Sequence, residues 1–219
     1  LKNDWDLLAN SIYQKRSFLA HLEKNNFSNQ RYYVLYEDGF LCAGAVVYSL
    51  KINLFTFAKL DLNVPMQIIG LPISNDENGL LGSAEYTEIL LSEIFKQENG
   101  IALCLNYQQP VLNKKLIKMS SLPSMILRRE HEDWESYLQS LRHPYRRRIL
   151  NALAKTQNIR SQSESCNAFS DDHYNQYLQV IHRSKTKLEV MGMKFFKNLP
   201  DPFKLDSFYD QEKLLYWHI

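Results

Sequence analysis

The residues best suited to chemistry are the arginines gathered in the run LRHPYRRRI at 141–149. From Arg142 to Arg160 the chain holds six Arg or Lys residues and no acidic residue. On a helix, Arg142 and Arg146 share a face while Arg147 points elsewhere, so cations surround one turn. Guanidinium groups bind phosphate or carboxylate through paired hydrogen bonds, and the positive end of the helix dipole adds to this attraction. The residues predicted to contact an anionic ligand in this run are Arg142, Tyr145, Arg146 and Arg147.

The same arginines have a simpler explanation, which is a solvated helix face. Acidic residues lie directly upstream and are placed to pair with them, at Glu130, Glu132, Asp133 and Glu135. Surface ion pairs of this kind contribute little to stability. The sequence favours neither explanation over the other. The helical pattern also predicts which apolar residues of this helix face inward, namely Tyr145, Ile149 and Leu153.

A second group of cations occupies the later half of another predicted helix. His182, Arg183, Lys185 and Lys187 complement the negative end of the helix dipole there, and that structural role is preferred for Lys187. Arg183 and Lys185 are nevertheless predicted to approach the same anionic ligand as the arginine run. The aromatic pair Phe195–Phe196 and the nearby Leu199 are predicted to lie in the core rather than in a ligand site.

Hydrophobic periodicity places these residues in a mixed α/β (α+β) domain. Helices are predicted over 11–24, 84–98, 133–141, 145–156 and 171–190. Strands are predicted over 31–37, 40–50, 52–58, 66–71, 101–106, 124–129, 158–163 and 214–219. The dipeptide Asp38-Gly39 between two β-rich runs is the strongest hairpin signal. In the helix over 84–98, the inward residues are predicted to be Tyr86, Ile89, Leu90, Ile94 and Phe95.

Composition and motifs exclude several classes of protein. The chain has 219 residues, 45% of them hydrophobic, and a net charge of +2, which allows a large core and argues against a dedicated DNA-binding protein. Metal-binding spacings such as CxxC and HExxH are absent, so no metal site is expected. The catalytic patterns GxSxG, GxxxxGK[ST] and GxGxxG are absent too. Glu37, Asp38 and Glu189 are candidate proton acceptors, but no signal singles one out.

The cysteines and the hydropathy suggest a cellular compartment. Cys42 and Cys104 sit in apolar runs and are predicted to be small buried thiols, and the third cysteine is Cys166. An odd number of distant cysteines fits a reducing, cytoplasmic setting. No apolar run approaches the length of about 18 residues that a transmembrane helix needs, so no transmembrane segment is expected.

In the order of these features the chain resembles the FemAB-like, peptidoglycan-biosynthesis-type N-acyltransferases of the GNAT superfamily. The stretches that carry the resemblance are 17–23 (SFLAHLE), the hairpin 31–49, the run 137–149, and the helix 177–199 ending in Phe195-Phe196-x-x-Leu. The resemblance implies a GNAT-like, mostly antiparallel mixed sheet flanked by helices. It further implies a first GNAT-like domain over 1–165. Residues 166–219 would then be a connecting helix and the truncated start of a second GNAT-like domain.

The resemblance also implies the reaction, which is transfer of an acyl or aminoacyl group to an amine in peptidoglycan or cell-envelope precursor metabolism. Acyl-CoA or aminoacyl-tRNA would be the donor, an anionic small molecule or precursor the partner, and tRNA a further partner. The family's CoA pattern, [RQ]xxGx[GA], is absent, so this part either lacks a CoA site or binds another donor. We expect the fragment to be inactive alone. The alternatives are a non-catalytic, degenerate GNAT-like binding module and an RNA-associated protein.

Overall fold

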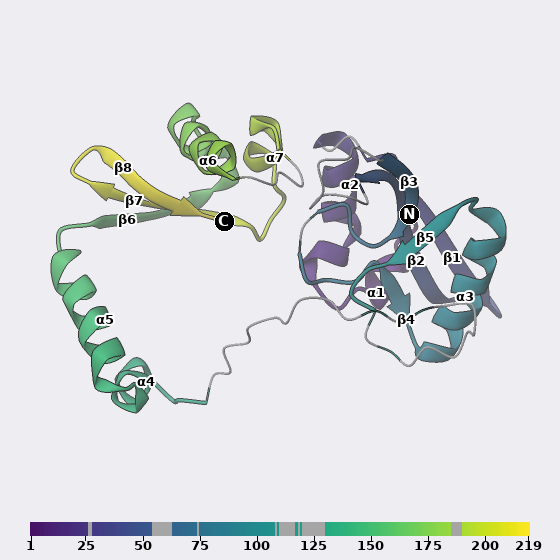
Figure 1. Cartoon of the computed structure of the whole chain (residues 1–219), viewed down its shortest axis with the longest axis horizontal. Helices are drawn as coiled ribbons and strands as arrows, with labels where there is room; N and C mark the ends of the chain where they lie inside the picture. The colour runs from purple at the N-terminus through teal and green to yellow at the C-terminus, as the bar shows by residue number, and fades with distance from the viewer. Residues whose placement is uncertain are drawn as a thin grey trace. The chain divides into compact units, whose positions relative to one another are not determined.

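The computed structural model describes residues 1–25, 28–53, 63–73, 75–107, 109, 117, 119, 130–184 and 190–219, with only the backbone of 52–53. Two compact units make up the chain (Figure 1). Unit 1 comprises Leu1–Ile117 and Ser165–Phe203, and unit 2 comprises Lys118–Glu164 and Lys204–Ile219. Because contacts define these units, they do not test the predicted GNAT-like domains 1–165 and 166–219, which stay a prediction.

Unit 1 combines short helices with a mixed sheet. Its described helical segments are α1 (Trp5–Leu8), the 3-10 turn η1 (Ile12–Gln14), α2 (Arg16–Asn25), α3 (Ala84–Gln97), the 3-10 turn η2 (Cys166–Ala168), α6 (Asp171–Arg183) and α7 (Met193–Lys197). Its described strands are β1 (Arg31–Glu37), β2 (Phe40–Asn53), β3 (Asn63–Ile69), β4 (Leu80–Gly82) and β5 (Ile101–Cys104).

The sheet of unit 1 is built on the long strand β2. The predicted hairpin is confirmed, because Asp38 and Gly39 turn β1 into β2 with φ angles of 49° and 83°, as a two-residue hairpin loop requires. β4 pairs with β2 at 43–45 and β3 pairs with it at 47–53, both antiparallel. β5 runs parallel to β3, and α3 lies between them in the chain. The predicted mixed fold with a mostly antiparallel sheet flanked by helices is therefore confirmed.

Side chains of β2 alternate between two cores, as a pleated strand dictates. Ala43, Ala45 and Val47 pack against α3 with Ile69 and Leu90. The other face of the sheet carries a second core, which joins α1 and α2 to the segment containing α7. The buried members of that core are Trp5, Phe18, Leu19, Leu22, Val46, Leu71, Leu81, Met191 and Phe195. Phe196 and Leu199 pack at its edge, so the prediction that these aromatic residues belong to the core is confirmed.

Two helices of unit 1 differ in detail from the prediction. The segment predicted as one helix over 11–24 is broken, because η1 ends before α2 begins at Arg16. In α3 the prediction for Ile89 is wrong: its side chain is 46% exposed, and Leu91 is buried instead. Three neighbouring apolar residues, Ile89, Leu90 and Leu91, compete for the inward face, and only the contacts with the sheet decide between them.

The remaining sequence predictions concern the cysteines and several elements near residues that the structure does not describe. Cys42 and Cys104 are half-buried and Cys166 is the buried thiol, so the prediction for the first two is wrong. Both half-buried cysteines lie at strand ends, where the sheet covers a side chain only partly. The predicted strand over 124–129 lies outside the described residues, as do residues 54–58 of the predicted strand over 52–58. The helix predicted over 171–190 is too long: α6 ends at Arg183, because the backbone turns extended at Ser184 (φ −70°, ψ 131°), and residues 185–189 lie outside the description.

Unit 2 contains α4 (Trp134–Ser140), α5 (His143–Lys155) and a sheet with the order β6-β7-β8 in its described part. These strands are β6 (Arg160–Ser165), β7 (Lys204–Asp210) and β8 (Lys213–His218). β7 and β8 form an antiparallel hairpin with Gln211 in the left-handed region at φ 53°. The helices predicted over 133–141 and 145–156 and the strands over 158–163 and 214–219 are confirmed. β7 has no counterpart in the prediction.

Candidate functional site

The arginine run forms the first turns of α5 in unit 2. Asp133 caps the preceding helix α4 by accepting a 2.7 Å hydrogen bond from the Ser136 backbone N–H, which holds the pKa of the Asp133 carboxyl below its usual value. Arg142 then serves as the N-cap of α5, and its carbonyl accepts hydrogen bonds from the backbone N–H groups of Tyr145 and Arg146 at 2.9 and 3.1 Å. Pro144 occupies the first turn, where its missing N–H costs nothing.

The side chains of this turn face outward. Arg142 and Arg147 are exposed, Arg146 is half-buried and Tyr145 is 55% exposed. The Arg148 guanidinium lies 6.0 Å from the centroid of the Tyr145 ring. Within the described ranges, no ion pair joins Arg142, Arg146 or Arg147 to a carboxylate. A simple solvated helix face would pair these arginines with the acidic residues directly upstream. The described residues show no such ion pairs.

The inward orientation predicted for the apolar residues of α5 is wrong. No residue of this fully described helix is buried, and Tyr145 and Leu153 are 55% and 46% exposed. Ile149 is half-buried. A helical apolar stripe identifies which side chains share a face, but burial needs a partner surface, which periodicity does not supply.

The remaining predicted ligand contacts lie in the other unit or outside the described residues. Arg183 is the last residue of α6, belongs to unit 1 and is exposed. Lys185 lies outside the described residues. The structure thus places Arg142, Tyr145, Arg146 and Arg147 on one helix, and their predicted cooperation with Arg183 and Lys185 stays a prediction.

The candidate proton acceptors have ordinary surroundings in the structure. Glu37 accepts a hydrogen bond from the Tyr86 hydroxyl, which raises the pKa of Tyr86 to about 12. Asp38 occupies the hairpin turn, and Glu189 lies outside the described residues. Among the described residues, no group of three His, Cys, Asp or Glu side chains is arranged to hold a metal ion.

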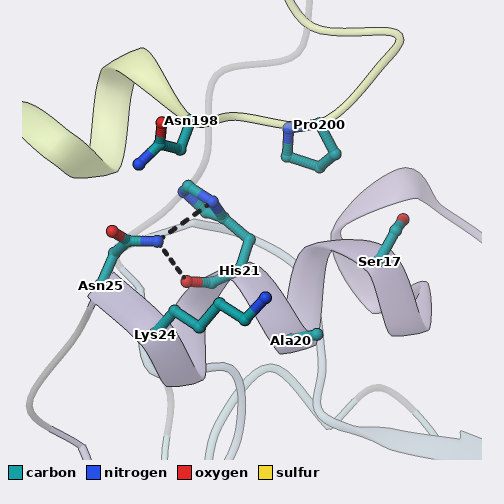
Figure 2. Close-up of a pocket in the computed structure, with 7 residues that line it drawn as sticks. All are labelled: Ser17, Ala20, His21, Lys24, Asn25, Asn198 and Pro200. Atoms are coloured by element: carbon teal, nitrogen blue, oxygen red, sulfur yellow. Dashed lines mark hydrogen bonds between the residues drawn. The ribbon is translucent and has the colours of Figure 1, made fainter.

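Unit 1 contains a pocket of about 330 Å³ that the sequence did not predict (Figure 2). One wall is a face of α2, and the other is the segment that follows α7. Its lining residues are Ser17, Ala20, His21, Lys24, Asn25, Asn198 and Pro200. The spacing of 17, 20, 21 and 24 is that of one helix face, which the sequence shows. The opposite wall comes from about 175 residues later in the chain, which no local pattern reveals.

His21 is the buried member of this pocket. Its side chain is 6% exposed and packs 4.9 Å from the Phe195 ring, centroid to centroid. The Asn25 amide donates to His21 Nδ1 at 3.3 Å and to the His21 carbonyl at 2.9 Å. Burial lowers the pKa of His21, and this outweighs the backbone groups of Phe195 and Asn198, which favour the charged ring.

The chain matches no protein-family model, no curated protein and no solved structure in the comparisons. The FemAB-like resemblance accordingly stays a prediction. None of the helices in the described part has the length and apolar character needed to cross a bilayer.

Proposed function

We propose that the chain is part of an enzyme that transfers an acyl or aminoacyl group to an amine acceptor, in cytoplasmic peptidoglycan or cell-envelope precursor metabolism. The observation that carries the proposal is the first two turns of α5. They present Arg142, Arg146 and Arg147 without carboxylate partners in the described part of the chain, next to the exposed ring of Tyr145. Unpaired guanidinium groups on one short surface suit an anionic ligand.

The transfer needs an uncharged amine and an oriented donor carbonyl. The amine nitrogen forms a bond to the acyl carbon, and the carbon–sulfur bond of a thioester or the carbon–oxygen bond of an aminoacyl ester breaks. A base takes the amine proton, and the departing thiolate or alkoxide gains one. Both donors carry phosphates, in CoA or in tRNA, and contacts from Arg142, Arg146 and Arg147 would hold them without taking part in bond making.

The test is the variant Arg146→Ala, titrated by calorimetry with acetyl-CoA and separately with tRNA. Losing one charge-assisted contact, worth about 1.5–3 kcal/mol, weakens binding by roughly 10- to 100-fold. Arg146 is half-buried and makes no side-chain hydrogen bond within the described ranges, so the unfolding midpoint should stay within a few degrees. Lys155→Ala, at the other end of α5, is the matched control. Unchanged affinity in Arg146→Ala, or no binding of either probe by the wild-type chain, removes this helix from the site.

A non-catalytic binding module is the second candidate, favoured by the missing phosphate-loop pattern and by the ordinary surroundings of Glu37 and Asp38. This candidate predicts that the 219-residue chain and longer forms of it bind acetyl-CoA or tRNA but transfer no group to an amine acceptor. For tRNA, affinity that falls steeply with salt supports phosphate contacts, and a flat response excludes them.

A further inference from the structure

The pocket beside His21 is a built site that the proposed function does not use. It lies wholly within unit 1, between α2 and the residues after α7. At about 330 Å³ it is at the lower end of the range for small-molecule sites. Its floor is the buried His21, while its rim is formed by exposed or half-buried side chains of Ser17, Lys24, Asn198 and Pro200. Figure 2 shows the imidazole ring directed from α2 toward Asn198.

The hydrogen bonds of His21 fix the tautomer of its ring at the floor of the pocket. Because Nδ1 accepts from the Asn25 amide, the neutral ring carries its proton on Nε2. Nε2 is buried and has no partner with hydrogen-bond geometry among the described residues. The backbone groups of Phe195 and Asn198 lie near enough to influence its pKa but do not meet that geometry. Because Nε2 is buried beside these backbone groups, a ligand in the pocket does not reach it, and His21 shapes the pocket floor without donating a hydrogen bond to the ligand.

The charge of the lining selects the kind of ligand. Among the described residues that line the pocket, Lys24 is the charged one when His21 is neutral, and none is a carboxylate. No salt bridge within the described ranges involves Lys24. In Figure 2 the Lys24 side chain runs back along α2 toward Ala20, as helical side chains do, so its ammonium group lies over the middle of the helix. Ser17 and Asn198 add a hydroxyl and an amide, which are neutral donors.

From one cation and two neutral donors around a pocket whose described lining holds no acid, we propose that this pocket binds the carboxylate of a small molecule. Lys24 supplies the counter-charge, and Ser17 and Asn198 supply hydrogen bonds. A monoanion matches the single ammonium group, whereas a phosphate dianion would leave one charge uncompensated. The inference uses none of the α5 arginines and does not rest on the proposed function.

The experiment titrates the full 219-residue chain with sodium acetate and follows the ring resonances of His21 and the side-chain amide of Asn198 by NMR. Sodium chloride at equal ionic strength corrects for salt. We expect saturable shifts of both groups. In Lys24→Met the acetate affinity falls by about tenfold, the loss of one charge-assisted contact at a partly exposed site. Ala20→Leu, which fills the exposed helix face between Ser17 and Lys24, abolishes the shifts.

Two controls separate this result from other causes. Lys15→Met removes an exposed lysine outside the pocket and should bind acetate like the wild type. Arg146→Ala should do so too, so the pocket and the proposed function can fail separately. Shifts equal to those with chloride, or unchanged affinity in Lys24→Met, overturn the proposal. Saturable binding of inorganic phosphate in place of acetate overturns the assignment to a carboxylate.

Discussion

The contact between Gly44 and Trp5 makes a quantitative prediction about how β2 and α1 pack. A Cβ at position 44 would lie 2.5 Å from Trp5 Cζ3 and 2.9 Å from Trp5 Cη2. Neither side can move freely. Gly44 is paired with Val34 on one edge of β2 and with Leu81 on the other. The Trp5 ring is 1% exposed, and its Nε1 donates a 2.8 Å hydrogen bond to the Gln14 carbonyl.

The expected cost of Gly44→Ala follows from these constraints. Overpacking a core by one methyl group costs about 1–3 kcal/mol. If the indole moves to make room, its hydrogen bond to Gln14, worth about 1 kcal/mol, weakens as well. Replacing Gly by Ala in a strand returns roughly 0.5–1 kcal/mol because the unfolded chain loses freedom. The free energy of unfolding should therefore fall by about 2 kcal/mol.

Urea unfolding followed by far-UV circular dichroism measures this change. Gly192→Ala is the matched control, because a Cβ there meets no atom within 4 Å and its φ of −75° suits alanine. It should change the unfolding free energy by less than about 1 kcal/mol. In a Trp5→Phe background, which lacks the clashing ring atoms, Gly44→Ala should cost less than about 1 kcal/mol. A cost of about 2 kcal/mol that persists in that background, or none in the wild type, would refute the reasoning.

Two further predictions concern pH. Burial lowers the pKa of His21, so its contribution to stability is present above the unfolded pKa of about 6.5 and is lost as the pH falls through the folded value. His21→Gln should therefore lose less unfolding free energy than the wild type between about pH 7 and pH 5. Equal losses in the two proteins would contradict this. Burial tends to raise the pKa of Glu98, but the hydrogen bonds from Arg31 and Tyr33, each 2.8 Å, lower it overall. Glu98→Gln should cost about 1 kcal/mol at neutral pH and less as the pH falls from the ordinary Glu value of about 4.3 through the lowered folded value, where the wild type loses the charge too. A cost independent of pH in urea titrations would argue against this ion pair.

The sequence predicts the parts of this fold that depend on neighbouring residues. The hairpin at Asp38-Gly39 follows from the φ angles that a two-residue loop demands, and α4 and α5 follow from caps and periodicity. Strand β4 is only three residues long and pairs with β2 across about 35 intervening residues. A strand so short has no periodicity of its own, so its pairing with β2 could not be predicted.

The two candidate sites also differ in whether the sequence reveals them, because one is local in the chain and the other is not. The arginines of α5 and its N-cap lie within seven consecutive residues, so two helical turns bring them together and the sequence is enough to find them. The His21 pocket needs Asn198 and Pro200 to close it, and long-range packing, of Phe195 on His21 and of Phe203 on Phe18, brings that segment to α2. The sequence shows only a histidine on a helix face, and its burial depends on a distant segment that no local pattern reveals. Acetate binding therefore tests more than a ligand, because it tests whether this long-range contact between α2 and the α7 segment forms as described.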